Sequence, residues 1–259
     1  MLKNALLWEV RDKNQDYPSY VFGTMHLFQQ SHAEFLTILE SIMEDVTMVF
    51  TEVSLSNPPA EWVYQLPDNQ TLKDLIGERK YQKSRRILLK ALDFDLDNYI
   101  SFLPLIITQQ ITLKIMGAEK QPSLDALIYQ MVLRNNKEYS GIESISEQMD
   151  IMSKIPLDYQ INSLVHLTRN ISTFRKKLIH LTILFQKQRI SELYKSSKKE
   201  MGGIRKILLY DRNVIIADRI ALFHQEKASL FTFGAGHLAG FMGVLSLLKR
   251  KGIKVRAVL

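Results

Sequence analysis

Two copies of the motif Gly-x-x-His are the residues of this sequence whose types and spacing best suit chemistry. Each ends an apolar run that is predicted to be a strand, SYVFGTMH at Ser19–His26 and LFTFGAGH at Leu230–His237. A glycine at the carboxyl end of a strand allows a tight turn and a close approach of the backbone. In open α/β sheets, ligands bind beyond the carboxyl ends of the strands. His26 and His237 are therefore predicted to converge on one site if their strands are neighbours.

Glu52 is the third candidate, at the end of the run TMVFTE. This run is predicted to form a strand parallel to the strand of His26. Two histidines and one carboxylate are a common ligand set for a hydrolytic metal ion, and they leave one coordination position for water. Structural roles are the alternative. Either histidine could cap a helix or bond a buried carbonyl group, and Glu52 could pair with a lysine.

The elements that must position these residues follow an α/β pattern. Short apolar runs bounded by turns alternate with helical periodicity at both ends of the chain, and the middle is mostly helical. The predicted strands are Ala5–Val10, Ser19–Phe22, Thr47–Val53, Glu138–Ile142, Leu230–Phe233 and Ile253–Leu259. One helix is predicted to begin near His32. The other predicted helices are Leu72–Ala91, Leu103–Met116, Ser123–Asn135, a long helix or pair of helices from Leu157, Asn213–Glu226 and Leu238–Lys251.

This order of elements predicts one α/β domain over residues 1–259. Its central sheet is mixed, largely parallel and formed by two βαβ-like halves, N-terminal (1–56) and C-terminal (204–259). A large, mostly helical insertion (57–203) separates them in the sequence. The polar segment Ser196–Gly203 is predicted to be a linker.

Composition limits the class of protein and of site. The chain has 259 residues, of which 46% are hydrophobic and 24% charged, which is typical of a globular protein. The absence of cysteine excludes disulfides, zinc–thiolate sites, cysteine nucleophiles and iron–sulfur clusters. The first residues do not resemble a signal peptide, and the apolar run Leu230–Leu248 is predicted to be a strand, a turn and a helix. A cytoplasmic location is expected, or a periplasmic or extracellular one if a leader has been removed.

Other common motifs are missing. The glycines of GAGHLAG do not have the G-x-G-x-x-G spacing, and no acidic residue occurs from Lys227 to Leu259. Neither a Walker A motif nor a G-x-S-x-G elbow is present. The net charge is +7, and a basic stretch runs from Arg79 to Lys90. This stretch matches no standard nucleic-acid module, so it is predicted to be a solvated helix face.

The sequence resembles the TraB/PrgY/GumN family, whose relatives include the Tiki metalloproteases. More distantly it resembles the erythromycin-esterase-like and ChaN-like proteins. The resemblance covers nearly the whole chain. It implies an α/β core with a helical insertion and a site built from both Gly-x-x-His motifs, Glu52 and Arg212. For the Tiki branch it also implies divalent-metal-dependent peptide hydrolysis. The matching blocks are Leu6–Val10, Tyr20–His26, the strand with Glu52, Ser123–Ile128, Gly141–Gln148, the pair Arg212-Asn213, and Phe233–Val255.

With this resemblance, the sequence predicts a metal-dependent hydrolase of peptide or amide bonds. His26, His237 and Glu52 would bind a divalent ion such as manganese, cobalt or zinc. Glu143 follows a predicted strand and is a candidate general base or a residue that orients the ligands. Arg212 could stabilise an oxyanion or bind a substrate carboxylate, or it could form a structural ion pair with Glu52 or Glu143.

Two other functions stay open. A histidine–glutamate pair could activate water without a metal, as in an esterase-like hydrolase. Alternatively, the protein could bind and sequester a peptide without cutting it. The expected partner is a peptide or a small amide or ester substrate, and neither nucleic acid nor a transmembrane segment is expected. The pattern indicates neither the identity of the metal nor the oligomeric state.

Overall fold

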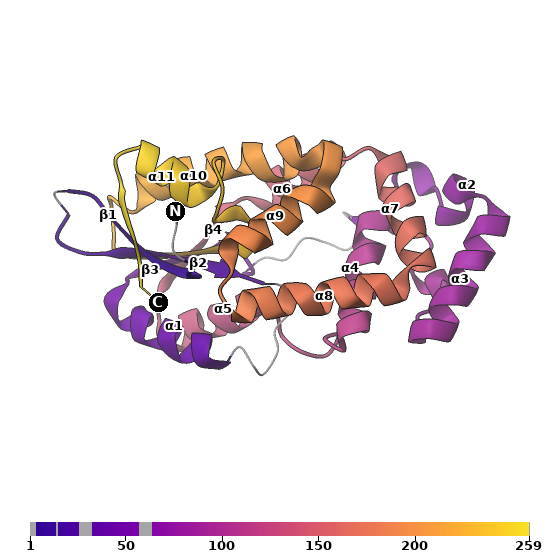
Figure 1. Cartoon of the computed structure of the whole chain (residues 1–259), viewed down its shortest axis with the longest axis horizontal. Helices are drawn as coiled ribbons and strands as arrows, with labels where there is room; N and C mark the ends of the chain where they lie inside the picture. Colours follow the sequence, from indigo (N-terminus) through magenta and orange to yellow (C-terminus); the bar gives the residue numbers. More distant parts are fainter. Residues whose placement is uncertain (1–3, 14, 26–32, 57–63, 259) are drawn as a thin grey trace. The chain divides into compact units, whose positions relative to one another are not determined.

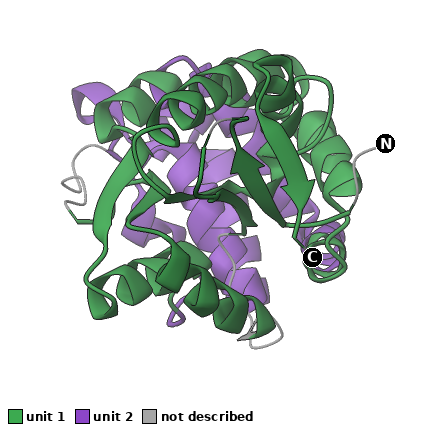
Figure 2. Ribbon diagram, turned by 90° about the vertical axis from the view of Figure 1, so that its left-hand side faces the viewer, with its two compact units in different colours: residues 1–58, 122–151, 181–259 green, residues 59–121, 152–180 purple. Residues whose placement is uncertain are grey.

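The computed structural model describes residues 4–13, 15–25, 33–56 and 64–258. They divide into two compact units, coloured green and purple in Figure 2. Unit 1 comprises residues 1–58, 122–151 and 181–259, and unit 2 comprises residues 59–121 and 152–180. The division of the chain at residues 56 and 203 stays a prediction. Within the predicted insertion, residues 122–151 and 181–203 belong to unit 1.

Unit 1 contains a six-stranded sheet in the order β4-β3-β5-β2-β1-β6. Strand β5 pairs in parallel with both β2 and β3, and β3 pairs in parallel with β4. Strand β1 is antiparallel to β2 and β6. The predicted mixed, largely parallel sheet, shared by both ends of the chain, is confirmed. The strands are β1 (Leu7–Arg11), β2 (Ser19–Thr24), β3 (Met48–Val53), β4 (Glu138–Glu143), β5 (Ser229–Gly234) and β6 (Lys254–Ala257).

The two central strands are buried on both faces. Every residue of β2 is buried, as are the first five residues of β5. Continuous apolar runs of this kind are typical of parallel strands that are covered by helices on both sides. Figure 1 shows α1 and α5 on one side of the sheet and α10 and α11 on the other. The helices of unit 1 are α1 (Ala33–Asp45), α5 (Leu124–Arg134), α6 (Ile145–Ser153), α9 (Ile190–Met201), α10 (Arg212–Phe223) and α11 (Val244–Arg250), with the last part of α8 (Ile171–Gln186).

Aromatic rings join the sheet to the helices on each face. On one face, the ring of Phe50 stacks between those of Phe223 and Phe231, with centroids 4.8 and 5.0 Å away. On the other face, Phe22 of β2 meets Phe35 of α1 at 5.9 Å. Such aromatic pairs stabilise a core beyond the area that they bury. The sheet is therefore held rigidly against both helical layers.

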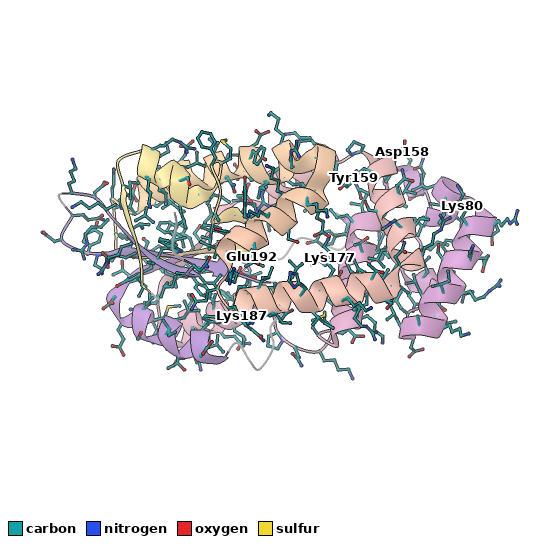
Figure 3. The ribbon with its side chains drawn as sticks, viewed as in Figure 1. Lys80, Asp158, Tyr159, Lys177, Lys187 and Glu192 are labelled. Atoms are coloured by element: carbon teal, nitrogen blue, oxygen red, sulfur yellow. The ribbon has the colours of Figure 1, made fainter. Side chains whose placement is uncertain are left out.

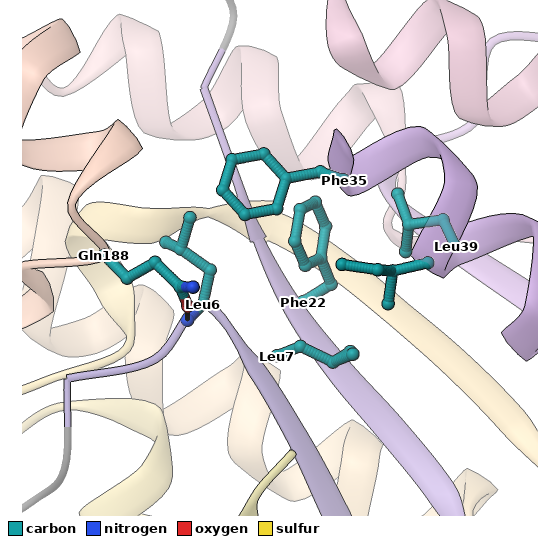
Figure 4. Close-up of a pocket in the computed structure, with 7 residues that line it drawn as sticks. Leu6, Leu7, Phe22, Phe35, Leu39 and Gln188 are labelled. Carbon is teal, nitrogen blue, oxygen red and sulfur yellow. Dashed lines mark hydrogen bonds between the residues drawn. The ribbon is translucent and has the colours of Figure 1, made fainter. Parts of the chain in front are cut away.

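A small apolar pocket of unit 1 lies where β1 and β2 meet α1. Figure 4 shows it lined by Leu6, Leu7, Phe22, Phe35 and Leu39, together with Ile38 and Gln188. The backbone amide of Leu6 donates a hydrogen bond of 2.9 Å to the side-chain oxygen of Gln188. The pocket's lining is otherwise hydrophobic, so it belongs to the core and offers few groups for chemistry.

Unit 2 is helical and has its own hydrophobic core. Tyr81, Leu88, Leu96, Ile107 and Ile111 are completely buried there. Lys80 of α3 is exposed and points away from the ribbon, as Figure 3 shows, which agrees with a solvated basic face. The helices of unit 2 are α2 (Leu72–Ile76), α3 (Glu78–Leu92), α4 (Pro104–Met116), α7 (Leu157–Arg169) and the first part of α8, with the 3-10 helices η3 (Pro67–Asn69) and η4 (Leu96–Tyr99).

Apart from shifts of a few residues at the ends of elements, three predicted segments differ from the structure. The predicted helix Leu72–Ala91 is interrupted at Gly77, whose φ of 80° is unsuited to a helix. The linker predicted at Ser196–Gly203 is wrong, because α9 continues to Met201. Buried Ile190 and Leu193 anchor that helix, so its polar end stays helical.

The third difference concerns the segment after the second Gly-x-x-His motif. A helix is predicted from Leu238, but α11 begins at Val244. Residues 238–243 form a compact turn in which Gly240 has a φ of 93°. A Cβ atom added at Gly243 would lie 2.0 Å from the carbonyl oxygen of Ala239, so only glycine fits there. The run Leu230–Leu248 is thus a strand, a turn and a helix, as predicted. Among the described residues, no helix has the length and apolar character needed to cross a bilayer.

His224, at the end of α10, is expected to make folding sensitive to pH. Its side chain is fully buried, with Nδ1 3.1 Å from the Gln15 oxygen and Nε2 3.6 Å from Asp12. Burial lowers the pKa of His224, and the charge of Asp12 opposes this only in part. Below about pH 6.5 the unfolded chain therefore binds a proton that the folded chain resists. Stability should fall from pH 7.5 to 5.5, by at most about 1.4 kcal/mol per pH unit from this group.

The measurement is urea unfolding of the wild type and of His224→Gln at both pH values. The variant should lose less stability on acidification, because glutamine does not titrate. His166→Gln, at an exposed position of α7, is the matched control. Equal pH dependence in the wild type and His224→Gln would contradict this account.

Candidate active site

Three of the residues singled out in the sequence lie at or directly after the carboxyl ends of neighbouring strands in unit 1, and a fourth, Arg212, contacts two of them. Glu52 is next to last in β3 and Glu143 is last in β4. His237 ends the 3-10 helix η7 (Ala235–His237), which follows β5 directly. Arg212 begins α10. The parallel pairing of β5, β3 and β4 brings these ends to one edge of the sheet, the usual place for a ligand site in such folds.

Arg212 bridges the two glutamates. Its Nη2 lies 2.5 Å from Oε1 of Glu52 and also donates to Oε2 of Glu143. Its Nε lies 3.1 and 3.2 Å from the two oxygens of Glu143. The side chains of Arg212, Glu52 and Glu143 are only 12%, 14% and 1% exposed. Of the alternatives for Arg212, the structural ion pair is thus present, and it involves both carboxylates.

The charges of this cluster do not cancel. Burial alone would lower the pKa of Arg212, but the neighbouring charges of Glu52 and Glu143 outweigh it and raise the pKa above the usual arginine value. The guanidinium group therefore stays cationic. One cation between two carboxylates leaves one net negative charge, which favours binding of a cation at this edge.

Glu52 is also tied to β5. Its Oε2 accepts a hydrogen bond of 3.1 Å from the backbone amide of Gly234. The side-chain amide of Gln148, on α6, lies 3.4 Å from Oε1. Together with Arg212, these donors hold the Glu52 carboxylate beside the carboxyl end of β5, the strand that His237 follows. Its position is therefore set by three different elements.

His237 is almost buried, with 7% of its surface exposed. Its Nδ1 lies 2.6 Å from the side-chain oxygen of Asn213, and its ring meets the edge of Phe233 at 6.4 Å. Two consecutive residues of α10 therefore fix the site: Arg212 binds both glutamates, and Asn213 binds His237. Sequence reasoning assigned no role to Asn213 or Gln148. The only signal was that both belong to blocks of the family resemblance.

The two motif glycines serve different purposes. A Cβ atom added at Gly23 would lie 2.5 Å from Leu238 and 3.0 Å from Ala235, so this glycine lets β2 pack against η7. A Cβ atom added at Gly234 would lie 3.5 Å from Cδ2 of His237 and 3.7 Å from Oε2 of Glu52. The histidine ring and the carboxylate thus border the same space beside Gly234.

His26 lies outside the described residues. Its strand, β2, ends at Thr24, which pairs with Gly234 of β5. The two motif strands are therefore neighbours, which is the condition for the predicted convergence. The convergence of the two imidazoles on one ligand stays a prediction.

The types of ligand that the described residues offer are suited to a divalent metal. No group of three or more histidine, cysteine, aspartate or glutamate residues suited to a metal occurs within the described ranges, which exclude His26. His237 and Glu52 nevertheless supply an imidazole and a carboxylate around one space. These are ligand types that zinc, manganese and cobalt accept. The net negative charge of the cluster agrees with a cation there.

A helix of unusual geometry leads into this site. Residues Lys206–Asp211 form a π-helix that ends directly before Arg212. Such wide turns are rare and often occur at functional sites. Arg212 and Asn213 are the first two residues of α10, directly after this π-helix.

Comparison with known proteins finds relatives that match nearly the whole chain. The chain is 19% identical to Metalloprotease TIKI1 of Danio rerio, 21% to Metalloprotease TIKI1 of Homo sapiens and 20% to Metalloprotease TIKI2 of Danio rerio. Each comparison covers 97% of this chain but only 60–63% of the relative's length. No solved structure matches the chain significantly. The model of the TraB/PrgY/gumN family matches residues 6–257, and the chain belongs to this family.

Proposed function

We propose that this protein is a metal-dependent hydrolase of peptide or amide bonds. The observation that carries the proposal is the cluster of Glu52, Glu143 and Arg212 beside His237 at the carboxyl ends of β3, β4 and β5. Distant relatives named metalloproteases support a hydrolase of this kind. Buried charges bound to one another are costly to maintain, and groups perturbed in this way cluster at functional sites.

In this proposal, His237 and Glu52 hold the metal together with His26. When bound, the ion lowers the pKa of a water molecule and polarises the scissile carbonyl group. Arg212 and the amide of Gly234 keep the Glu52 carboxylate directed at the space beside Gly234. Fixed ligands of this kind raise metal affinity because less ordering is needed on binding.

Glu143 orients Arg212 in this arrangement. Its side chain is 1% exposed, and the guanidinium group contacts both of its oxygens. A general base must reach the proton that it removes, directly or through one water. Glu143 is therefore less suited to that role than Glu52, whose Oε2 borders the space beside Gly234.

The test starts from protein treated with a chelator and dialysed. Manganese, cobalt and zinc are added separately, the melting temperature is measured, and a peptide library is then incubated and analysed by mass spectrometry. A ligand that binds only the folded state stabilises it by about 2.7 kcal/mol at a hundredfold excess over Kd. We expect one of these metals to raise the melting temperature and to restore cleavage.

The other outcomes distinguish the alternatives. Cleavage that persists in chelator, with no thermal shift for any metal, would replace this proposal with the metal-free histidine–glutamate hydrolase. Binding of a peptide whose mass is unchanged after long incubation with all three metals would favour a sequestering protein.

A further inference from the structure

We infer that Asn213 is a positioning residue that sets the tautomer of His237, so that Nε2 of the imidazole carries the lone pair offered to the site. The assignment of the tautomer depends only on the contacts of Asn213. Its use for metal binding rests on the proposed function.

Two short hydrogen bonds define the position of the Asn213 side chain. Its Nδ2 donates to the carbonyl oxygen of Met242 at 2.6 Å, and its Oδ1 lies 2.6 Å from Nδ1 of His237. Asn213 is completely buried and His237 nearly so. Bonds in such a place are not exchanged for bonds to water, so they determine the orientation of both groups.

The chemistry of the partners then determines where the protons are. A backbone carbonyl only accepts hydrogen bonds, so the NH₂ group of Asn213 must face Met242 and its oxygen must face His237. An amide oxygen also only accepts, so Nδ1 of His237 must carry the proton. In a neutral imidazole the other nitrogen, Nε2, then holds the lone pair.

The lone pair lies on the edge of the ring that borders the site. Cδ2, the carbon bonded to Nε2, is the ring atom 3.5 Å from the Cβ position of Gly234, and Oε2 of Glu52 is 3.7 Å from that position. The protonated edge, at Nδ1, is occupied by Asn213. The ring edge that carries Nε2 is therefore the one nearer Gly234, opposite the edge that Asn213 occupies.

Asn213 also links His237 to the turn that follows it. His237 directly precedes the turn of residues 238–243 and Met242 lies near its end, and Asn213 bonds a group of each. Within it, Gly240 has a positive φ and the amide of Gly243 donates to the carbonyl of Gly240. One side chain of α10 therefore fixes both the backbone of the turn and the proton of the histidine.

The test is nitrogen NMR of protein labelled with 15N-histidine, at pH 8 and after chelator treatment. The His237 signals are assigned with His237→Gln. We expect a proton on Nδ1 and none on Nε2 in the wild type. This measurement needs no variant of Asn213, so it remains decisive if such variants fold poorly.

Two substitutions test the cause. Asn213→Leu fills the volume but cannot accept a bond, so the two tautomers should mix, and affinity for the activating metal should fall 10- to 100-fold in calorimetry. Asn213→Asp keeps an acceptor for Nδ1 but loses the donor to the carbonyl group of Met242, so it should retain the tautomer and lose less affinity than Asn213→Leu. A purely structural role would not predict this rescue.

A wild-type proton on Nε2, or an unchanged tautomer in a folded Asn213→Leu, would overturn the inference. The two proposals can fail separately. A protein with the expected tautomer that binds none of the three metals would retain the role of Asn213 and refute the metal-dependent function. Metal binding by a protein with the opposite tautomer would refute the inference alone.

Discussion

Arg212→Ala is expected to lower the free energy of unfolding by about 3–5 kcal/mol. The substitution leaves Glu143, which is 1% exposed, and Glu52, which is 14% exposed, as buried carboxylates without their common cation. Removing one partner of a buried ion pair is costly because the remaining charge is neither solvated nor compensated. Urea unfolding at pH 7.5 measures the effect.

The matched control is Arg134→Ala. Arg134 pairs with Glu40 at 2.8 Å, but these side chains are 64% and 51% exposed. Exposed pairs contribute at most about 1 kcal/mol. If Arg212→Ala costs no more than Arg134→Ala, then the cluster at the strand ends does not stabilise the fold.

Glu52→Gln is expected to reduce hydrolysis at least about 100-fold while the protein remains folded. Glutamine can still accept from the amide of Gly234, and Glu143 continues to pair with Arg212, so the local structure has support. A neutral amide, however, is a weak metal ligand and no base. The rise in melting temperature on metal addition should therefore also be largely lost.

Glu147→Gln is the control for this substitution. Glu147 pairs with Arg219 at 2.5 Å, outside the proposed ligand set. Glu147→Gln makes the same chemical change in a glutamate that is also bound by an arginine. It should leave hydrolysis and the metal-induced rise in melting temperature nearly unaltered. A fully active Glu52→Gln enzyme would remove Glu52 from the mechanism.

The local elements could be predicted from the sequence because each has a local physical signal. Fully apolar runs predict the central strands, and Ser123 predicts the start of α5, where its hydroxyl accepts from the amide of Ala126. The placement of Glu52 and His237 at one sheet edge follows from a single rule about parallel strands. These features can be predicted without knowing the tertiary contacts.

The features that could not be predicted depend on contacts between distant segments. Residues after His237 have the apolar spacing of a helix, yet they stay in a turn until Val244. Within this turn, a Cβ atom added at Gly240 would lie 2.3 Å from the ring of Tyr194 on α9. The role of Asn213 depends on the carbonyl group of Met242, and no pattern within α10 reveals it. The sequence predicts an ion pair of Arg212 with Glu52 or Glu143 as one alternative, but the contact with both glutamates depends on how α10 lies against β3 and β4.

The position of β5 has a consequence for biosynthesis. This strand lies between β2 and β3, although it is made long after them. Until the chain has been translated through Gly234, two apolar strands lack the neighbour that satisfies their backbone groups, and Glu52 lacks both its amide donor and Arg212. Contacts between such distant segments slow folding and prolong the exposure of strand edges. The nascent chain should therefore depend on chaperones until β5 emerges, and the sheet and the active site should form together in one late step.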